Sequence, residues 1–317
     1  MRIWILSILQ RIWQSILLIN LYRLSCLGGL TLKITCIFCG EEKESSLEHV
    51  IPEAIGNNSF TTNIVCTDCN SALGATIDDK FVNSFPIEMK REMLGLKGYK
   101  GNIPQVLRCG KDSNGNTIIL DKDSGPKYIP KVTEKDNSFS VMANSKKEVA
   151  KIIKKKLKRK QVPKEIGKAL KKIENTEVEE SRPKINFRYN YNVSNFKLEF
   201  LKIAFEYMNI YYGDTYRQDP IENRLKNILN QFKSGNIADY SKYVIDVPSK
   251  LSTPVMNALK RSKQNIHIIL PVIGPNNRLF ISILLFNGEF SYSVLVSNHG
   301  DAYPSILGKR RSILISK

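Results

Sequence analysis

Residues 33–82 decide the fold of the first part of the chain, through three groups: Cys36-Ile-Phe-Cys39, Glu48-His49-Val-Ile-Pro52 and Asn63-Ile-Val-Cys66-Thr-Asp-Cys69-Asn70. Two Cys-x-x-Cys pairs provide four thiolates, and each short loop can direct both of its sulfur atoms at one ion. The spacing therefore predicts a structural zinc ion held by Cys36, Cys39, Cys66 and Cys69. Four thiolates fill a tetrahedral shell, so we expect no open position for a substrate on this ion.

The two cysteine pairs stand further apart than in a simple zinc ribbon, because residues 40–65 separate them. This insert contains Glu48 and His49, which a ribbon with a purely structural role does not need. The surrounding stretch is rich in Cys, Gly, Asn and Asp and has little apolar periodicity, as expected where a metal ion holds the fold. We therefore expect residues 33–82 to form a separate small module.

These residues together resemble the HNH endonucleases, in the branch that carries cysteines and a zinc knuckle. The resemblance covers residues 33–82 and implies a ββα-metal fold that hydrolyses phosphodiester bonds in nucleic acid. It implies that Glu48 binds the catalytic divalent ion, His49 is the general base, Asn63 pins the hairpin that orients this base, and Asn70 is a second metal ligand. Many members have Asp at the place of Glu48 and a closing His at that of Asn70.

Metal-assisted hydrolysis of a phosphodiester requires the same residue types. Carboxylate and amide oxygens suit Mg²⁺ or another hard divalent ion, and a neutral imidazole can accept a proton from attacking water near physiological pH. Asp78 or Asp79, a little beyond Asn70, is a candidate for a further oxygen ligand. Structural alternatives stay open: His49 as an additional zinc ligand, and the two asparagines as turn and cap residues.

The amino-acid composition indicates which kind of binding partner and which cellular compartment to expect. The 317 residues are 42% apolar, which is enough for two globular domains, and the net charge of +18 attracts polyanions such as nucleic acid, with DNA as the expected partner. Lysines spread over a solvated surface are the alternative explanation of this charge. Six cysteines, four of them in metal-binding pairs, favour a reducing compartment, so we expect a cytoplasmic protein.

The remainder, residues 83–317, is predicted to be one larger, basic α+β domain, possibly one that binds nucleic acid. Residues 105–108 and 117–120 predict a hairpin, and the lysine-rich residues 146–175 an amphipathic helix broken near Pro163. The lysine-rich stretch can contact phosphates or can be an ordinary solvated helix face. Helices are expected from residue 196 and from Asp219 to Gly235, and a β-meander over residues 266–296.

The first 32 residues are strongly apolar, but Gln10, Arg11, Gln14, Asn20 and Arg23 interrupt the run. No uninterrupted stretch approaches the roughly 20 residues that a spanning helix needs, so we expect no stable membrane association. This segment is either an amphipathic helix or the product of a start codon assigned upstream of Leu32. Nothing in the sequence indicates the oligomeric state or a target sequence.

The sequence thus predicts an α+β protein in which a zinc-stabilised HNH module is followed by a larger α+β domain. Its predicted activity is metal-dependent endonucleolytic cleavage of DNA. Two alternatives remain: a zinc-binding protein that recognises nucleic acid without catalysis, and a ribonuclease with the same chemistry.

Overall fold

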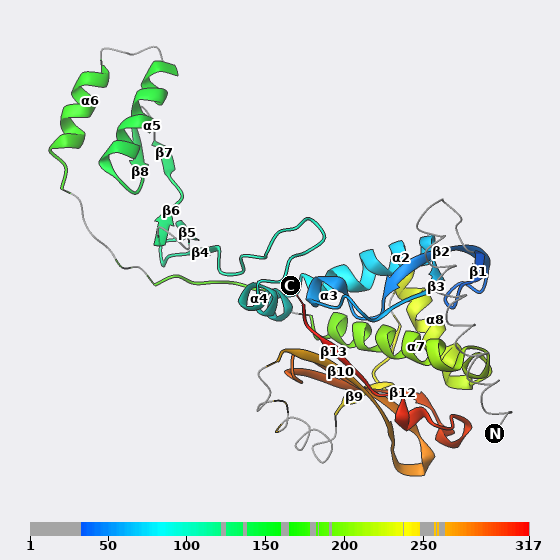
Figure 1. Ribbon diagram of the computed structural model, residues 1–317. Helices are drawn as coiled ribbons and strands as arrows, with labels where there is room; N and C mark the ends of the chain where they lie inside the picture. Colours follow the sequence, from blue (N-terminus) through cyan, green and yellow to red (C-terminus); the bar gives the residue numbers. More distant parts are fainter. Residues whose placement is uncertain are drawn as a thin grey trace, which may run out of the picture. The chain divides into compact units, whose positions relative to one another are not determined.

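The computed structural model describes residues 33–316 apart from residues 122–124, 136–137, 160–164, 178–181, 183, 190–191, 237, 248–256, 258 and 260–263 (Figure 1). The amino-terminal apolar segment and the break expected near Pro163 lie outside these residues. The chain forms two compact units. Of the described residues, those from 33 to 103 join those from 192 onward in the first, and those between 104 and 191 form the second.

The first unit begins with a three-stranded antiparallel sheet in the order β1-β2-β3, made of β1 (Lys33–Thr35), β2 (Glu42–His49) and β3 (Thr61–Cys66). A short 3-10 helix η1 (Glu53–Ile55) lies between β2 and β3. Helix α2 (Thr67–Leu73) starts directly after β3 and continues through the π-helical turn η2 (Gly74–Asp78) into α3 (Asp79–Val82). β2, β3 and α2 therefore follow one another in the expected ββα order.

Helix α4 (Phe85–Leu94) completes this part of the chain. Ser84 stands at its N-cap and Pro86 in its first turn, where the missing backbone N–H of proline does no harm. The helix ends at Gly95, whose φ of 70° lies in the left-handed region that glycine adopts without strain.

The same unit continues with α7 (Val193–Arg217) and α8 (Pro220–Lys233). A five-stranded antiparallel sheet follows, in the order β13-β10-β11-β12-β9. Its strands are β9 (Val244–Asp246), β10 (Ile266–Ile273), β11 (Leu279–Leu285), β12 (Phe290–Ser297) and β13 (Arg311–Leu314). Three 3-10 helices, η3 (Pro275–Asn277), η4 (Gly300–Ala302) and η5 (Ile306–Gly308), lie in its connections.

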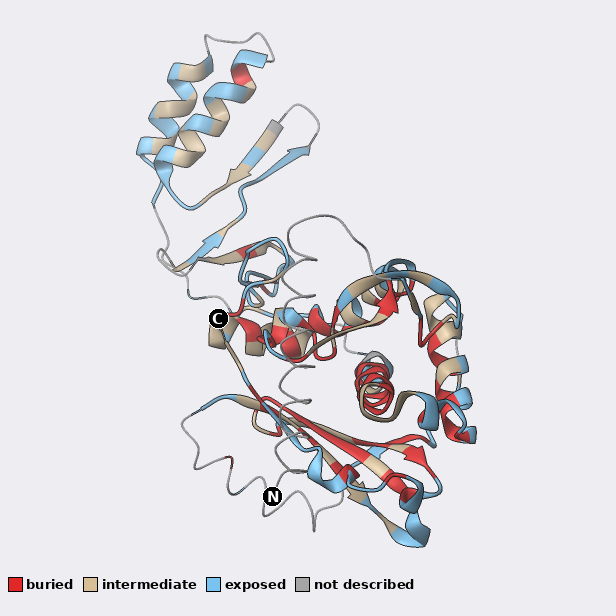
Figure 2. Ribbon diagram, turned by 45° about the vertical axis from the view of Figure 1, so that its right-hand side comes forward, coloured by how far each residue is buried: buried red, intermediate tan, exposed pale blue. Residues whose placement is uncertain are grey.

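Helix α7 is the centre of the first unit. It lies between the five-stranded sheet and the ββα segment, and Figure 2 shows it buried around most of its circumference. The Phe38 and Phe205 rings are 5.3 Å apart, and those of Phe81 and Phe196 are 5.0 Å apart. One hydrophobic core therefore runs from the cysteine-rich segment through α7 to the sheet.

The second unit contains a three-stranded sheet and a helical pair. The sheet has the order β4-β5-β6, with β4 (Cys109–Lys111), β5 (Thr117–Asp121) and β6 (Gly125–Tyr128). A hairpin of β7 (Lys131–Lys135) and β8 (Ser138–Met142) leads to α5 (Lys146–Arg159) and α6 (Glu165–Glu174). Asp112 stabilises the β4–β5 turn because its Oδ1 accepts the backbone N–H groups of Asn114 and Asn116.

The division of the chain differs from the predicted one, which separated residues 33–82 from a single domain over residues 83–317. The cysteine-rich segment instead shares its core with α7, α8 and the sheet, because the apolar faces of these elements cover one another. Residues 104–191 form a unit inserted into that fold.

Most predicted elements are present. The lysine-rich stretch forms α5 and α6, the aromatic helix forms α7, and Asp219 caps α8 by accepting the backbone N–H of Ile221 at 2.8 Å. The meander is β10-β11-β12. The first strand of the hairpin predicted at residues 105–120 starts later than expected, since β4 covers Cys109–Lys111 rather than residues 105–108. No helix within the described residues is both long and apolar enough to cross a bilayer.

Candidate zinc centre and nuclease pocket

The four predicted cysteine ligands meet at one point. Their Sγ atoms all lie within 4.8 Å of one another, and those of Cys39 and Cys66 are 3.9 Å apart. A tetrahedral zinc ion with Zn–S bonds of about 2.3 Å separates its sulfur atoms by roughly 3.8 Å, so the cluster fits this ion. Burial raises the pKa of the Cys66 and Cys69 thiols, so zinc binding must release protons from them.

The zinc centre is supported by α8. The Lys233 ammonium donates to Cys69 Sγ at 3.3 Å, and Asn230 Nδ2 donates to the backbone oxygen of Phe38 at 2.8 Å. Four thiolates around a divalent ion leave an excess negative charge, which the ammonium of Lys233 partly offsets. Helix α8, from the carboxyl-terminal half of the chain, therefore stabilises the cysteine cluster.

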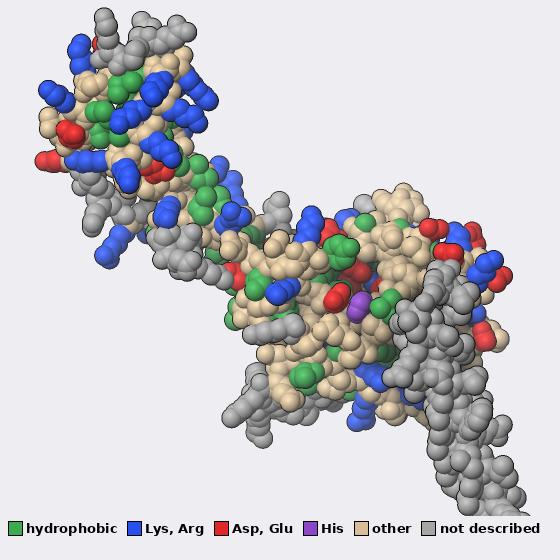
Figure 3. Space-filling view, turned by 45° about the horizontal axis from the view of Figure 1, so that its top comes forward, with side chains coloured by type: hydrophobic (Ala, Val, Ile, Leu, Met, Phe, Trp, Pro, Cys, Tyr) green, Lys and Arg blue, Asp and Glu red, His purple; other side chains and the backbone are tan. Residues whose placement is uncertain are grey.

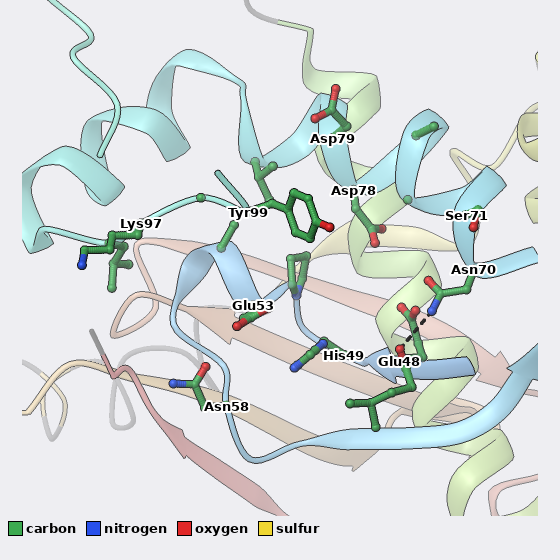
Figure 4. Close-up of a pocket in the computed structure, with 18 of the residues that line it drawn as sticks. Glu48, His49, Glu53, Asn58, Asn70, Ser71, Asp78, Asp79, Lys97 and Tyr99 are labelled. Atoms are coloured by element: carbon green, nitrogen blue, oxygen red, sulfur yellow. Dashed lines mark hydrogen bonds between the residues drawn. The ribbon is translucent and has the colours of Figure 1, made fainter. Parts of the chain in front are cut away.

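A pocket of about 1220 Å³ opens beside the end of β2 (Figure 4). Its walls come from β2, the η1 turn, α2 with η2 and α3, and the loop that follows α4. Its polar lining includes Glu48, His49, Glu53, Asn58, Asn70, Ser71, Asp78, Asp79, Lys97, Tyr99 and Ser316. Three of the four predicted catalytic residues, Glu48, His49 and Asn70, thus line one cavity.

Glu48 and His49 are the last two residues of β2, opposite Thr62 and Thr61 of β3. Successive side chains of a strand point to opposite faces, so these neighbours have different surroundings. Glu48 is buried with 3% of its surface exposed, whereas His49 is half-buried. Burial raises the pKa of the Glu48 carboxyl, while the charge of Lys202 acts to lower it.

Asn70 joins α2 to the strand that carries these residues. Its Nδ2 donates to Ser46 Oγ at 2.9 Å and to the backbone oxygen of Leu47 at 3.0 Å. Figure 4 shows Asn70 beside Glu48, with Asp78 directed toward the same space. Because the nitrogen makes these bonds, the side-chain oxygen of Asn70 is the atom suited to bind a cation.

Asn63 lies on β3 at an irregularity in the hairpin. Ser46 pairs with Val65 and Glu48 with Thr62, so Asn63 and Ile64 face the single residue Leu47. Asn63 does not line the pocket. It is placed where a side chain can affect the course of β2 immediately before His49, and not where it can contact a substrate.

Lys202 of α7 is a site residue that sequence reasoning missed. Its Nζ lies 2.6 Å from Glu48 Oε1, 2.8 Å from both carboxylate oxygens of Asp78, and 3.8 Å from Glu206 Oε1. Burial acts to lower the pKa of Lys202, but the carboxylates of Asp78, Glu206 and Glu48 outweigh it and raise that pKa well above its ordinary value. Lys202 is therefore a buried cation held by acidic partners.

Two further acids of α7, Glu199 and Glu206, are buried near Lys202. Burial raises the pKa of both carboxyls well above the ordinary value for glutamate, while the charge of Lys202 acts to lower it. With Lys202 they follow one another at helical spacing among the buried residues of α7. Charged residues at that spacing were the available signal, since an apolar helix face tolerates them only where they are paired.

The other two histidines have structural surroundings. His267 is completely buried, with Nε2 3.0 Å from the backbone oxygen of Ile55. His299 is exposed and precedes the short helix η4, where its backbone N–H donates to Ser297 Oγ at 2.9 Å. Neither lines the pocket.

Comparison with known proteins agrees with this geometry. Residues 36–86 match the family model described as HNH endonuclease, which confirms the resemblance seen in the motif residues. The matched segment contains the cysteine cluster, Glu48, His49, Asn63, Asn70 and Asp78. No curated protein and no solved structure that was compared with the chain matches it.

The match makes this segment similar to a nuclease that acts on nucleic acid, and the cysteines agree with the zinc-knuckle branch. The pocket suits a hard divalent ion as well, because Glu48, Asn70 and Asp78 bring oxygen donors to one wall. These donors differ in kind from the sulfur ligands of the zinc centre. The two sites therefore suit ions of different chemistry.

Proposed function

We propose that this protein is a metal-dependent endonuclease that hydrolyses phosphodiester bonds in DNA. The observation that carries the proposal is the convergence of His49, Glu48 and Asn70 on one pocket, within a segment that matches the HNH endonuclease family. The zinc cluster would act as the scaffold, since its four thiolates leave no position for a substrate.

In this mechanism His49 is the general base. Its half-buried position at the pocket allows a neutral imidazole to accept a proton from a water molecule that attacks the phosphorus atom. Glu48 and Asn70 would hold Mg²⁺ or a similar ion through oxygen atoms. Such an ion, when bound, polarises a phosphoryl oxygen and stabilises the charge that develops on the leaving group.

The remaining residues fix the geometry of this base. Asn70 ties α2 to β2 through its bond to the backbone oxygen of Leu47, two residues before His49. Asn63, at the irregularity opposite Leu47, would set the direction in which β2 presents His49. Position matters because catalysis by proton transfer requires the base to be within hydrogen-bond reach of the water.

The inserted unit would supply affinity for the nucleic acid backbone. Residues 104–191 contain 22 of the 48 lysines and arginines but only 11 of the 30 aspartates and glutamates. Figure 3 shows Lys and Arg side chains spread over the surface of the α5 and α6 region. Clustered cations bind phosphates by displacing condensed counterions, so this affinity should fall steeply as salt rises.

The test is cleavage of supercoiled plasmid in the presence of Mg²⁺ or Mn²⁺. Zinc-loaded wild-type protein is compared with His49→Ala and, as a matched control, His299→Ala, which alters an exposed histidine outside the pocket. We expect nicking by the wild type and the control and its loss in His49→Ala. Zinc content is measured in each preparation, so that collapse of the fold is not mistaken for loss of the base.

Two other results would redirect the proposal. Tight binding to DNA without cleavage by any preparation, with His49→Ala binding as well as the wild type, would indicate a zinc-binding recognition protein. Cleavage of RNA but not of DNA would retain the chemistry and change the substrate, because the same general base and divalent ion serve both polymers.

A further inference from the structure

Lys202 stands between two carboxylates that line the nuclease pocket. Its Nζ is 2.6 Å from Glu48 and 2.8 Å from both oxygens of Asp78, while its own side chain is 1% exposed. Glu48 Oε1 and the Asp78 carboxylate therefore already have a cationic partner that the protein itself supplies.

This partner comes from a distant part of the chain. Glu48 and Lys202 are 154 positions apart, and the inserted unit lies between them in sequence. Taking a lysine out of water is costly unless good ion pairs compensate it, and here they do. An apolar side chain in the same place would leave Glu48 buried without this partner. The ammonium therefore controls the local charge that the Glu48 carboxylate experiences.

The net charge of the three groups shows how Lys202 affects the binding of a divalent ion. Glu48 and Asp78 contribute two negative charges, and Lys202 returns one positive charge, so the three groups together present a single net negative charge. Divalent ions bind more tightly as the charge of the ligand set becomes more negative. Because Lys202 contacts both carboxylates, Glu48 and Asp78 together offer a divalent ion one net negative charge and not two.

We propose that Lys202 is a positioning residue that sets the cation capacity of the nuclease centre, its ammonium taking the place of a second metal ion beside Glu48 and Asp78. This inference rests on the proposed function for its meaning, but its test does not depend on cleavage. The centre takes up one divalent ion, and loss of the ammonium increases its affinity for divalent ions.

The experiment is a Mn²⁺ titration of zinc-loaded protein, followed by electron paramagnetic resonance of the free ion. Four proteins are compared: the wild type, Lys202→Met, Asp78→Asn, and the double variant Lys202→Met with Asp78→Asn. The same three groups carry net charges of −1, −2, 0 and −1 in this order. Glu199 and Glu206 are retained in all four proteins.

We expect Mn²⁺ affinity to follow charge. Lys202→Met should bind Mn²⁺ at least roughly tenfold more tightly than the wild type or take up a second ion, because a unit charge a few ångströms from a divalent ion has about this effect even at the dielectric constant of water. Asp78→Asn should bind more weakly, and the double variant should resemble the wild type. Lys202→Arg, which keeps the charge, should also resemble the wild type.

Equal affinity in all four proteins, or weaker binding by a zinc-loaded and folded Lys202→Met, would overturn the proposal. If Lys202→Met does not fold, the double variant carries the test, because it removes Lys202 together with Asp78, one of the carboxylates that Lys202 pairs with. If the double variant bound Mn²⁺ far more weakly than the wild type, the net charge of the three groups would not be what sets the affinity. Normal Mn²⁺ behaviour without plasmid cleavage would count against the nuclease assignment and leave this inference standing.

Discussion

His267, which is buried in the five-stranded sheet, should make the stability of the protein depend on pH. Phe286 N–H donates to its Nδ1 at 3.2 Å, so Nδ1 is the acceptor. Nε2 then carries the proton and donates to the backbone oxygen of Ile55 at 3.0 Å. The neutral ring has both nitrogens satisfied, and a second proton on Nδ1 would remove an acceptor from a site with no exposed surface.

The magnitude follows from the pKa of this ring. Burial lowers the pKa of His267 from 6.5 to about 4, while its bond to Ile55 opposes the change. Between these values the unfolded chain binds a proton that the folded protein does not, so stability falls as pH falls. The full effect is about 3.4 kcal/mol, and roughly 1.4 kcal/mol should already be lost between pH 7.5 and 5.5.

The assay is urea denaturation of zinc-loaded wild type and His267→Gln between pH 7.5 and 5.5. An amide can also donate to Ile55 and accept from Phe286, but it does not titrate in this range. The difference in free energy of unfolding between the two proteins should therefore shrink by roughly 1.4 kcal/mol toward pH 5.5. A difference that stays constant with pH would refute the assigned tautomer and burial of His267, since effects of zinc and of other groups are common to both proteins.

Three further outcomes are expected. Gly56→Ala should lower the free energy of unfolding by more than about 1 kcal/mol, because Gly56 has φ +95° and an added Cβ would lie 2.5 Å from Ile315 Cγ2; an unchanged urea midpoint would contradict this. Lys233→Met should weaken zinc binding about tenfold in competition with a chelator, whereas Lys233→Arg should retain most of it. Removal of zinc should lower the Tm and abolish Mn²⁺ binding at the pocket, since Cys66 and Cys69 fix the start of the helix that carries Asn70; readdition of zinc should restore both.

Much of the fold could be predicted because its signals are local. The Asp219-Pro220 start of α8 is a capping pattern of adjacent residues, and the alternating apolar runs of the meander identify β10, β11 and β12 without reference to the rest of the chain. The cysteine cluster is equally local, since the two cysteines of each pair are three positions apart in the chain.

The features of the fold and of the site that the sequence did not predict depend on contacts between residues that are distant in the chain. Helix α7 was recognised as a core helix from its aromatic residues. Its ion pair between Lys202 and Glu48 joins residues 154 positions apart, and neither stretch of sequence indicates the other as its partner. The boundary at residue 82 was misplaced for the same reason. The contacts of Phe38 and Phe81 with α7 show that the cysteine-rich segment belongs to the same core as the carboxyl-terminal sheet.

Ser316, which follows strand β13, bears on the order of events during synthesis. Ser316 lines the nuclease pocket, its backbone N–H donates to the oxygen of Gly56, and its hydroxyl accepts from Asn58. Domains fold as they emerge from the ribosome, amino-terminal parts first. Here the cysteine pairs are synthesised early, but the pocket beside them lacks part of its wall until residue 316 has been added. A growing chain thus carries Glu48, His49 and Asn70 long before the wall of their pocket is complete.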